Sequence, residues 1–490
     1  MRTRRIVLAL KLSIAAALLA GCGGGGGGSS DAQAPTATLT APANFADGLI
    51  GTVTLTATAS DDVGVASVEY QVDGKTLLTT SSGPTYPAPL VTGNFASGQH
   101  VIRARARDGA GNISDWATAT VRFGGTVGVP AGFTKNEAWS SNLGAATAFS
   151  QAPDGRLFVA EQGGNLRVVQ TDGTVLPTPF LSVVVSGDFA TTERGLLGVA
   201  LHPNFTTTSP FVYVYYTTGT APIHNRVSRF TVNPTNANIA SANSEVLILD
   251  LPNLVATNHN GGAIHFGADG KLYVGVGDNA NSANSQDLNS PLGKMLRLND
   301  DGRIPGDNPF CTTAGQQRCA VWARGLRNPF TFAVQPGTGR IHINDVGEGT
   351  WEEINLGAAS ANFGWPASEG PDNVTAGVTA PLFTYKHSAA APAGSGPGGF
   401  FTGNVIAGGT FYPTSGTNAV FPVDFQGHYF FADFGSRFVA RLDLNNLDAS
   451  GKNVAYAFAS LAGNPVDMLV GLDGALYVLT RGAITKISFP

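Results

Sequence analysis

A pattern that recurs six times restricts the fold of residues 133–490 more than any other feature of the chain. Each copy is a turn followed by a strand with alternating or continuous apolar residues, as in PDGRLFVAE, GADGKLYVGVGD and GLDGALYVLTRG. A unit of this size cannot bury both faces of its own sheet, so such units pack against each other around a common axis. The repetition predicts an all-β, six-bladed β-propeller with four strands in each blade. The recurring strands are expected to start at Leu157, Val212, Leu272, Ile341, Tyr429 and Leu476.

The segment before the repeats, residues 35–123, also predicts short strands, but in a different arrangement. It contains runs with alternating polar and apolar residues, such as GTVTLTATAS and VASVEYQVD, separated by turn pairs such as Asp73-Gly74. Short alternating strands at this spacing predict a β-sandwich. The run ASDDVGVASVEYQVDG, followed by GQHVIRARARDGAGN, resembles the bacterial Ig-like domains of surface proteins, which implies a stalk or adhesive module. Residues 124–132, rich in Gly, Val and Pro, are expected to link this module to the propeller.

Charge and hydropathy argue against two classes of partner. The net charge is −5 at pH 7 and the Lys and Arg residues form no basic stripe, so we expect no binding to nucleic acid. The sequence has no apolar run of the roughly 18 residues that a membrane-spanning helix requires.

The first 21 residues have the features of an export signal rather than of a folded element. Arg2, Arg4 and Arg5 precede a short apolar stretch at residues 12–20. The sequence Leu-Ala-Gly-Cys at residues 19–22 resembles the lipobox of bacterial lipoproteins, which implies cleavage before Cys22 and acylation of that cysteine. Gly23 follows, so the resemblance implies an outer-membrane lipoprotein that contacts the membrane only through its lipid. Residues 22–34, which include a run of Gly, are expected to be a flexible tether.

Cys311 and Cys319 are the cysteines that remain once Cys22 is acylated. They lie close together in the sequence, and an exported protein folds in an oxidising compartment, so we predict a local disulfide. Two free thiols are the alternative. No Cys or His spacing typical of a zinc site occurs.

Residues 257–303 contain the first candidates for chemistry. A strand from Lys271 to Val276 follows an Asp-Gly turn, with His259 in an Asn- and Gly-rich loop before it and Asp278 at its far end. A histidine and a carboxylate at the ends of neighbouring strands can act as a general base and its orienting partner. The alternative is structural, with His259 capping a turn and Asp278 closing a hairpin.

Further polar motifs lie at turns after other recurring strands, where a propeller carries its ligands. They are GLLGVALHPNF, LGKMLRLNDDGRIPGDNPF, GLRNP, DVGEGTWEEINL and NFGWP. Taken together and in this order, the motifs resemble the soluble PQQ-dependent sugar dehydrogenases, the glucose/sorbosone dehydrogenase family. The resemblance extends from Phe133 to the C-terminus, and it implies oxidation of a sugar with PQQ and calcium as cofactors.

The resemblance also implies roles for individual residues. His259 matches the general base that takes the proton of the anomeric hydroxyl while hydride passes to the quinone, which yields a lactone. Asp278 matches the carboxylate that orients this histidine. Arg327 matches the arginine that neutralises charge developing on the quinone oxygen, and Asn328 flanks the cofactor. Glu193 falls where the glucose enzymes place a glutamine near the substrate.

Calcium sites are implied at two places. Gly347 and Glu348 match positions whose backbone carbonyls hold the active-site calcium against the quinone, and oxygen ligands suit this hard cation. A second, structural calcium site is implied for Asn258, Asp345, Glu353 and the Phe363 carbonyl. Structural alternatives stay open, since Arg327 could be a clamp that pairs with a carboxylate, and Asp345 and Glu353 could cap turns.

Two other residue types have simpler expected roles. Trp322, Trp351 and Trp365 are expected to pack within blades, although Trp365 could stack on a pyranose ring. Glu352 is expected to be solvated.

The chain departs from the family's pattern where cations are needed for the three carboxylates of PQQ. The glucose enzymes supply a lysine and two arginines late in the chain, where Gly435, Asn464 and Val466 stand in this sequence. Val346 stands where those enzymes have another cofactor-contacting glutamine. The candidates for compensation are Arg194, Arg437 and Arg441.

These observations predict an exported lipoprotein whose propeller oxidises an aldose or a related sugar and passes the electrons to an external acceptor. The alternative is a non-catalytic propeller that binds a glycan or a protein partner at the cell surface. His259, Asp278 and Arg327 together favour the enzyme, because a binding protein has no need of all three on one face. The missing late cations favour the binding protein.

Overall fold

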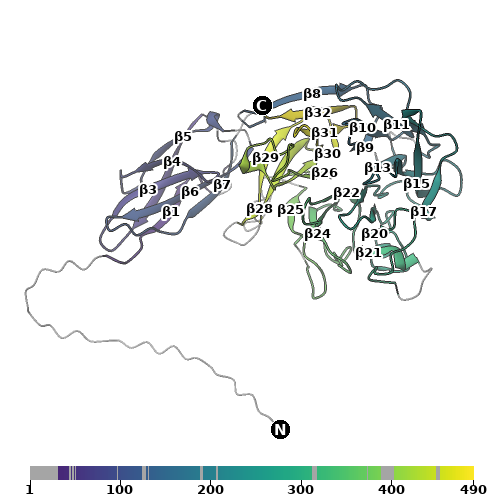
Figure 1. Cartoon of the computed structure of the whole chain (residues 1–490). Coiled ribbons are helices and arrows are strands. Elements are labelled where there is room, and N and C mark those ends of the chain that lie inside the picture. Colours follow the sequence, from purple (N-terminus) through teal and green to yellow (C-terminus); the bar gives the residue numbers. More distant parts are fainter. Residues whose placement is uncertain are drawn as a thin grey trace, which may run out of the picture.

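The structure is a computed structural model that describes residues 31–43, 46, 49, 51–95, 98–123, 129–130, 132–187, 191–205, 208–311, 317–371, 373–387, 402–447 and 453–490. Nearly every element in this part of the chain is a β-strand, and Figure 1 shows a smaller and a larger group of sheets. The predicted signal segment, the acylation site at Cys22 and most of the predicted tether and linker lie outside the described residues. None of the described helices has the length and apolar character to cross a membrane.

The N-terminal strands form two antiparallel sheets around one core, which confirms the predicted β-sandwich. The strand orders are β1-β2-β5 and β4-β3-β6-β7. Alternation of residue type sets the faces, since Val68, Tyr70 and Val72 of β3 are buried while the residues between them are partly exposed. The elements are β1 (Thr36–Ala41), β2 (Thr52–Ser60), β3 (Val65–Val72), β4 (Lys75–Thr80), β5 (Ala88–Val91), η1 (Thr92–Asn94), β6 (Gly98–Asp108) and β7 (Ala117–Phe123).

The strands after the linker form six antiparallel sheets in the described residues, which is consistent with the predicted six blades. We number these sheets 1 to 6 along the chain. The recurring strand of the sequence pattern is the second strand of each sheet and starts within one residue of the predicted position.

Sheets 1 to 3 have four strands each, and sheet 2 carries an additional strand, β16 (Asn236–Ala240). Sheet 1 comprises β9 (Ala146–Gln151), β10 (Leu157–Glu161), β11 (Asn165–Val169) and β12 (Leu181–Ser182). Sheet 2 comprises β13 (Leu196–Leu201), β14 (Phe211–Thr217), β15 (His224–Asn233) and β17 (Val246–Asn253). Sheet 3 comprises β18 (Ile264–Phe266), β19 (Leu272–Val276), β20 (Lys294–Leu298) and β21 (Val321–Arg324).

Sheets 4 to 6 repeat the four-stranded arrangement. Sheet 4 comprises β22 (Pro329–Val334), β23 (Ile341–Asp345), β24 (Trp351–Gly357) and β25 (Phe383–Lys386). Sheet 5 comprises β26 (Ile406–Phe411), β27 (Tyr429–Asp433), β28 (Phe438–Leu447) and β29 (Asn453–Ser460). Sheet 6 comprises β30 (Pro465–Val470), β31 (Leu476–Thr480), β32 (Ala483–Ser488) and β8 (Thr134–Ser141).

The six sheets close into a ring. Their first strands contact one another in the order β9, β13, β18, β22, β26 and β30, and β30 contacts β9 again. Sheet 6 takes its outer strand from the start of the propeller, because β8 pairs with β32. This pairing joins the two ends of the propeller chain. The sequence pattern did not indicate it, since β8 does not carry the recurring motif.

Apolar packing between neighbouring sheets stabilises the ring. The second strands β10, β19, β23, β27 and β31 are buried along their whole length, which explains their nearly continuous apolar sequences. Phe158 of β10, for example, shares one core cluster with Val212 and Val214 of β14. Burial of this kind contributes roughly 25 cal/mol for each Å² of apolar surface removed from water.

Three short helices and one disulfide complete the described elements of the propeller. Cys311 and Cys319 are disulfide-bonded, which confirms the prediction. The bond lies beside η2 (Gln317–Ala320), between β20 and β21. The helix α1 (Ala283–Gln286) follows β19, and η4 (Val423–Phe425) precedes β27.

The Ig-like module contacts the outer strand of sheet 5. Val101 of β6 packs with Val454 and Tyr456 of β29. Lys75 also forms an ion pair with Asp424 at 3.0 Å. The module is therefore docked on the outside of the ring.

Candidate active site

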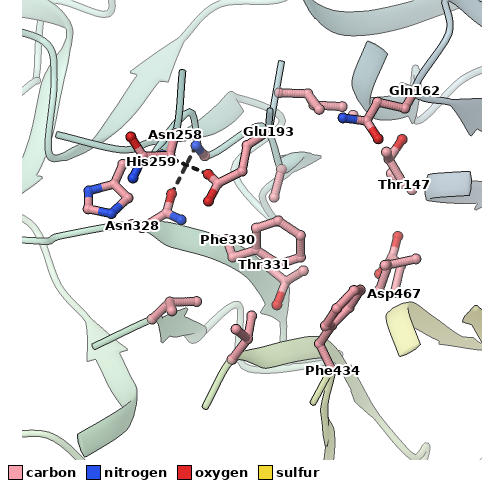
Figure 2. A pocket seen from close by; sticks show the side chains of 18 of the residues that line it. Thr147, Gln162, Glu193, Asn258, His259, Asn328, Phe330, Thr331, Phe434 and Asp467 are labelled. Atoms are coloured by element: carbon pink, nitrogen blue, oxygen red, sulfur yellow. Dashed lines mark hydrogen bonds between the residues drawn. The ribbon is translucent and has the colours of Figure 1, made fainter. Parts of the chain in front are cut away.

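A cavity of about 600 Å³ lies where the first strands of the six sheets converge. This volume suits a small-molecule ligand. Figure 2 shows Glu193, Asn258, His259 and Asn328 on one side of it, and Gln162, Phe434 and Asp467 on the other. We call the first group, together with the adjacent Arg327, the histidine wall. We call the second group the far wall, together with Val466, which precedes Asp467, and Arg481, which hydrogen-bonds to Gln162.

His259 and Asp278 form a hydrogen-bonded pair in the histidine wall. Nδ1 of His259 lies 2.7 Å from Oδ1 of Asp278. The side chain of Asp278 is 2% exposed and that of His259 is 11% exposed, so the carboxylate is shielded while the imidazole borders the cavity. An Nδ1–H that donates to the carboxylate leaves the lone pair on Nε2. Within the described part of the chain, no side chain or backbone group hydrogen-bonds to Nε2.

Asp278 is itself held by donors from two sheets. Its Oδ2 accepts a hydrogen bond from Nε1 of Trp365 at 3.0 Å, and its Oδ1 accepts one from the backbone N–H of Ala280 at 2.8 Å. The backbone N–H of Asp278 donates to the carbonyl of Arg327 at 2.8 Å. The carboxylate therefore has a fixed position, which in turn fixes the imidazole. Sequence analysis placed Trp365 only in packing or stacking, because a contact between sheets leaves no local signal in the sequence.

The loop that carries His259 is held from both sides. His259 has a φ of 54°, in the left-handed region that few non-Gly residues adopt. Its backbone N–H donates to Oε2 of Glu193 at 2.7 Å, and the N–H of Gly261 donates to Oδ1 of Asn328 at 3.1 Å, as the dashed lines in Figure 2 mark. Such a backbone conformation persists only where its surroundings over-determine it. Glu193 and Asn328 therefore shape the histidine loop in addition to lining the cavity.

Arg327 and Asn328 are anchored through Asp345. Their backbone N–H groups donate to the two oxygens of the Asp345 carboxylate at 3.0 and 2.7 Å. The Arg327 guanidinium donates to the Val346 carbonyl at 3.1 Å and lies 5.7 Å from the ring of Trp365. Its Nε is buried without a hydrogen-bond partner in the described residues. The side chain is thus not the carboxylate clamp that the structural alternative required, and it retains a donor for a ligand.

Asp345 and Glu353 lie opposite each other on neighbouring strands of sheet 4. Burial raises the pKa of Asp345, and burial together with the Asp345 carboxylate raises the pKa of Glu353. Two buried carboxyl groups in this position disfavour each other's charge unless a proton or a cation is shared. Their oxygens suit a hard cation such as calcium, although the Asp345 carboxylate also caps the start of β22, as the alternative proposed.

The other two residues of the predicted structural calcium site have their described contacts elsewhere. The carbonyl of Asn258 accepts a long hydrogen bond of 3.4 Å from Asn279, and Asn258 lines the cavity. Phe363 is buried, and its backbone N–H donates to the Arg324 carbonyl at 3.0 Å. The pairing of β23 with β24 thus brings together Asp345 and Glu353. No described contact joins Asn258 or the Phe363 carbonyl to them, so their part in the site stays a prediction.

The turn between β23 and β24 is organised by Glu369. Oε1 of Glu369 accepts hydrogen bonds of 2.9 to 3.2 Å from the backbone N–H groups of Glu348, Gly349, Thr350 and Trp351. Because the carbonyl of a trans peptide points opposite to its N–H, the carbonyls of Gly347 and Glu348 are directed away from Glu369. Both residues line the cavity. A Cβ at Gly347 would lie 1.7 Å from the Trp351 carbonyl oxygen, so this position requires glycine.

The expectation that Glu352 is solvated is wrong. Its side chain is fully buried, hydrogen-bonds to His387 and accepts the N–H of Ile406 at 2.9 Å. The hydrogen bond to Glu352 raises the pKa of His387. Glu352 is thus a structural link between sheets 4 and 5.

The far wall contains three polar residues that sequence analysis missed. Gln162 follows β10, and its Oε1 accepts a hydrogen bond from Nη2 of Arg481 on the turn after β31. Their positions carry no motif, and only the closure of the ring brings sheets 1 and 6 together. Asp467 is buried in the same wall, which raises its pKa to about 7.

The arginines expected to supply cations to the cavity have other contacts. Arg194 donates to the Ala256 carbonyl at 2.9 Å, and Arg437 donates to the Ala462 carbonyl at 3.2 Å. Arg441 lies between the rings of Phe425 and Tyr456, where sheet 5 meets the Ig-like module. The described arginines that line the cavity are instead Arg327 and Arg481.

Fold and site together define a β-propeller with a small-molecule cavity where the first strands of its six sheets converge. The sequence profile of the glucose / sorbosone dehydrogenase family matches residues 143–488. The chain belongs to this family, which confirms the resemblance of its motifs. Residues 35–104 match the profile of the bacterial Ig domain, in agreement with the N-terminal sandwich.

The regions that align with this chain make up most of one curated relative and about half of another. An aldose sugar dehydrogenase of Escherichia coli (strain K12) is 28% identical over 366 residues, which cover 70% of this chain and 89% of that protein. Quinoprotein glucose dehydrogenase B of Acinetobacter calcoaceticus is 29% identical over 254 residues, which cover 46% of this chain and 51% of that protein. Among solved structures, an oxidoreductase of Thermus thermophilus that is described as a glucose dehydrogenase is 27% identical with a TM-score of 0.60. The match covers 73% of this chain and 100% of the other.

Proposed function

We propose that the propeller oxidises the anomeric carbon of an aldose or a related sugar to a lactone, with PQQ and calcium as cofactors and an external electron acceptor. The observation that carries the proposal is the His259–Asp278 pair, whose free Nε2 borders the cavity beside Arg327. The relatives support it by their names, since one is an aldose sugar dehydrogenase and another is a quinoprotein glucose dehydrogenase.

The chain's own residues handle the proton of the reaction. Nε2 of His259 takes the proton of the anomeric hydroxyl, and Asp278 stabilises the imidazolium that results. The hydrogen bonds from Trp365 and Ala280 keep the Asp278 carboxylate in position beside the imidazole of His259. When bound, PQQ would supply the two-electron oxidant for the carbon–hydrogen bond. Arg327 offers positive charge on the same wall.

The residues present fit PQQ in two respects. The volume of about 600 Å³ lies in the range of cofactor sites. The unpartnered Nε of Arg327 is a buried donor that an anionic ligand would satisfy. Arg327 and Asn328 would hold the cofactor from the histidine wall.

Calcium fits the chemistry of two donor sets. The Gly347 and Glu348 carbonyls, directed away from Glu369, would hold the ion beside the cavity. The buried Asp345–Glu353 pair would hold a second ion, whose charge would offset the repulsion between the carboxylates. Asn258 and the Phe363 carbonyl would complete that second site.

A propeller that only binds a glycan is the second candidate, and the apolar part of the far wall favours it, since Phe434 and Val466 line the cavity there. The two functions differ because only the enzyme turns over a sugar.

The test is reduction of a dye by the purified propeller, loaded with PQQ and calcium, in the presence of a panel of aldoses. The enzyme predicts sugar-dependent dye reduction that EDTA abolishes. Saturable glycan binding without dye reduction would support the binding protein and reject the enzyme.

The cellular location belongs to the same proposal. An acylated Cys22 would tether the propeller to the outer membrane, with the Ig-like module as a spacer. Metabolic labelling with a clickable fatty acid should tag the full-length protein and should not tag Cys22→Ser. Equal labelling of both proteins would reject the lipid anchor.

A further inference from the structure

The far wall contains a cation that the proposed function leaves unused. Arg481 lies on the turn between β31 and β32 and lines the cavity. Its described hydrogen bonds go to neutral acceptors, the Ala146 carbonyl at 3.3 Å and the side-chain amide of Gln162. No carboxylate of the described residues forms an ion pair with it, and burial lowers its pKa. A buried cation without a counter-charge is unfavourable, and an anionic ligand would offset that cost.

Gln162 fixes the guanidinium without neutralising it. The two N–H groups of its amide donate to the carbonyls of Thr192 and Arg194 at 2.9 and 2.8 Å. Because both amide hydrogens are used, the oxygen must face Arg481. A guanidinium has five N–H donors, so the two described hydrogen bonds leave about three for a ligand. The pair is therefore preorganised for a planar anion, and a carboxylate matches this fork geometry.

Arg481 lies close to the positions at which the sequence lacks the expected cations. Its backbone N–H donates to the Asn464 carbonyl at 3.2 Å, and Val466 lines the cavity nearby. These are two of the positions at which the sequence lacks an expected cation. Arg481 thus brings a positive charge to the same end of the cavity from the next turn of the chain.

The two cavity arginines belong to different parts of the ring. Arg327 precedes β22 of sheet 4, whereas Arg481 is fixed between sheet 6 and Gln162 of sheet 1. In the order of contacts around the ring, sheet 5 separates sheets 4 and 6, and sheet 1, which carries Gln162, is opposite sheet 4. A ligand that spans the cavity could therefore meet a guanidinium on each wall.

We propose that Arg481, oriented by Gln162, is a carboxylate-binding subsite in the far wall of the cavity. For its ligand the inference rests on the proposed function, because PQQ carries three carboxylates. A sugar acid such as glucuronate offers the same chemistry, so the test includes both sources.

Direct binding to the metal-loaded protein measures the subsite without turnover. The probes for titration calorimetry are PQQ, its trimethyl ester, glucuronate and glucose. Arg481→Met removes the charge and keeps the length, and Arg481→Lys keeps the charge. Arg437→Met is the matched control, because Arg437 also donates to a backbone carbonyl but does not line the cavity. Melting curves check that each variant is folded.

We expect Arg481→Met to weaken PQQ binding by about tenfold to a hundredfold, the range of a hydrogen bond to a charged group. Arg481→Lys should lose less affinity for PQQ, and Arg437→Met should bind PQQ like the wild type. The affinity for the trimethyl ester should be unchanged in all three variants. If the wild type binds PQQ and Arg481→Met binds it equally well, the subsite is rejected and the proposed cofactor stands. Equal losses for PQQ and its ester would also reject the subsite, because the effect would then be structural.

Two further outcomes separate the subsite from the proposed function. If the wild type binds no PQQ but binds glucuronate better than glucose, and only Arg481→Met loses that preference, the subsite holds and the cofactor is wrong. If the wild type binds neither anion, both proposals fail.

Discussion

The two walls of the cavity fix their side chains in different ways. In the histidine wall, His259 is held by the Asp278 carboxylate, its backbone is held by Glu193, and Asp345 anchors the arginine loop. In the far wall, a neutral amide holds Arg481, and the hydrogen bonds that Asp467 accepts from the described residues come from the backbone N–H groups of Phe149 and Met468. Carboxylates that orient a base suit proton transfer, whereas a charged group with spare donors suits ligand recognition. Changes in the histidine wall should therefore reduce kcat, and changes in the far wall should reduce affinity.

The largest effect should come from His259. His259→Ala removes the proposed base, and we expect kcat for an aldose to fall by about 10² or more while PQQ affinity changes little. Steady-state kinetics and a PQQ titration measure the two quantities separately. The matched control is His224→Ala, which breaks another histidine–carboxylate pair, His224–Asp250 at 3.1 Å, outside the cavity. A His259→Ala variant with wild-type kcat would show that the histidine wall does not transfer the proton.

A smaller effect is expected for the groups behind the base. Asp278→Asn keeps the shape of the side chain but removes its charge, so the imidazolium loses its partner and kcat should fall by about tenfold to a hundredfold. Trp365→Phe removes one of the donors to that carboxylate, and kcat should fall only a few-fold. If Trp365→Phe impaired turnover more than Asp278→Asn, the indole would act on the ligand itself rather than through Asp278.

Glu369 tests the link between the histidine wall and calcium. Glu369→Gln removes the charge that gathers four backbone N–H groups, so the Gly347 and Glu348 carbonyls lose their fixed direction. We expect calcium affinity to fall by about tenfold, the lower end of the effect of groups that orient metal ligands. Calcium titration of the apo protein measures this directly. The control is Glu245→Gln. It alters a carboxylate that accepts hydrogen bonds from the hydroxyl groups of Tyr216 and Ser228 in sheet 2, and it should leave calcium affinity unchanged.

Sequence predicted the elements whose signals are local. The recurring strand identified all six sheets, because each second strand is buried on both faces and is apolar for that reason. His259 and Asp278 stood out because they flank one such strand. The closing strand β8 was not predicted, since it is an outer strand with a mostly polar sequence.

Contacts between segments that are far apart in the chain left no signal in the sequence. Trp365, Glu369 and Arg481 each act on a residue of a different segment, and none lies at the distance from its partner that a helix or hairpin would impose. Glu352 was misassigned for the same reason, since its carboxylate meets His387, which follows β25, and the backbone N–H of Ile406 in sheet 5. In a propeller the ring decides which turns meet, and it places Arg481 on the same cavity that Val466 lines.

The smallest expected effect concerns the stability of the far wall. Burial raises the pKa of Asp467 to about 7, whereas an Asp in the unfolded chain titrates near about 4. The folded state therefore favours the protonated carboxyl. This contribution to stability is complete below the unfolded pKa and is lost as the pH rises through about 7.

Asp467→Asn does not titrate, but its amide can accept only one of the backbone hydrogen bonds from Phe149 and Met468. The variant should thus be less stable than the wild type at about pH 5, and the difference should shrink by about 1 kcal/mol or more at about pH 9. Denaturant unfolding at the two pH values measures it, and parallel pH profiles would show that Asp467 stays ionised and has a partner in the far wall, which would weaken the contrast between the two walls.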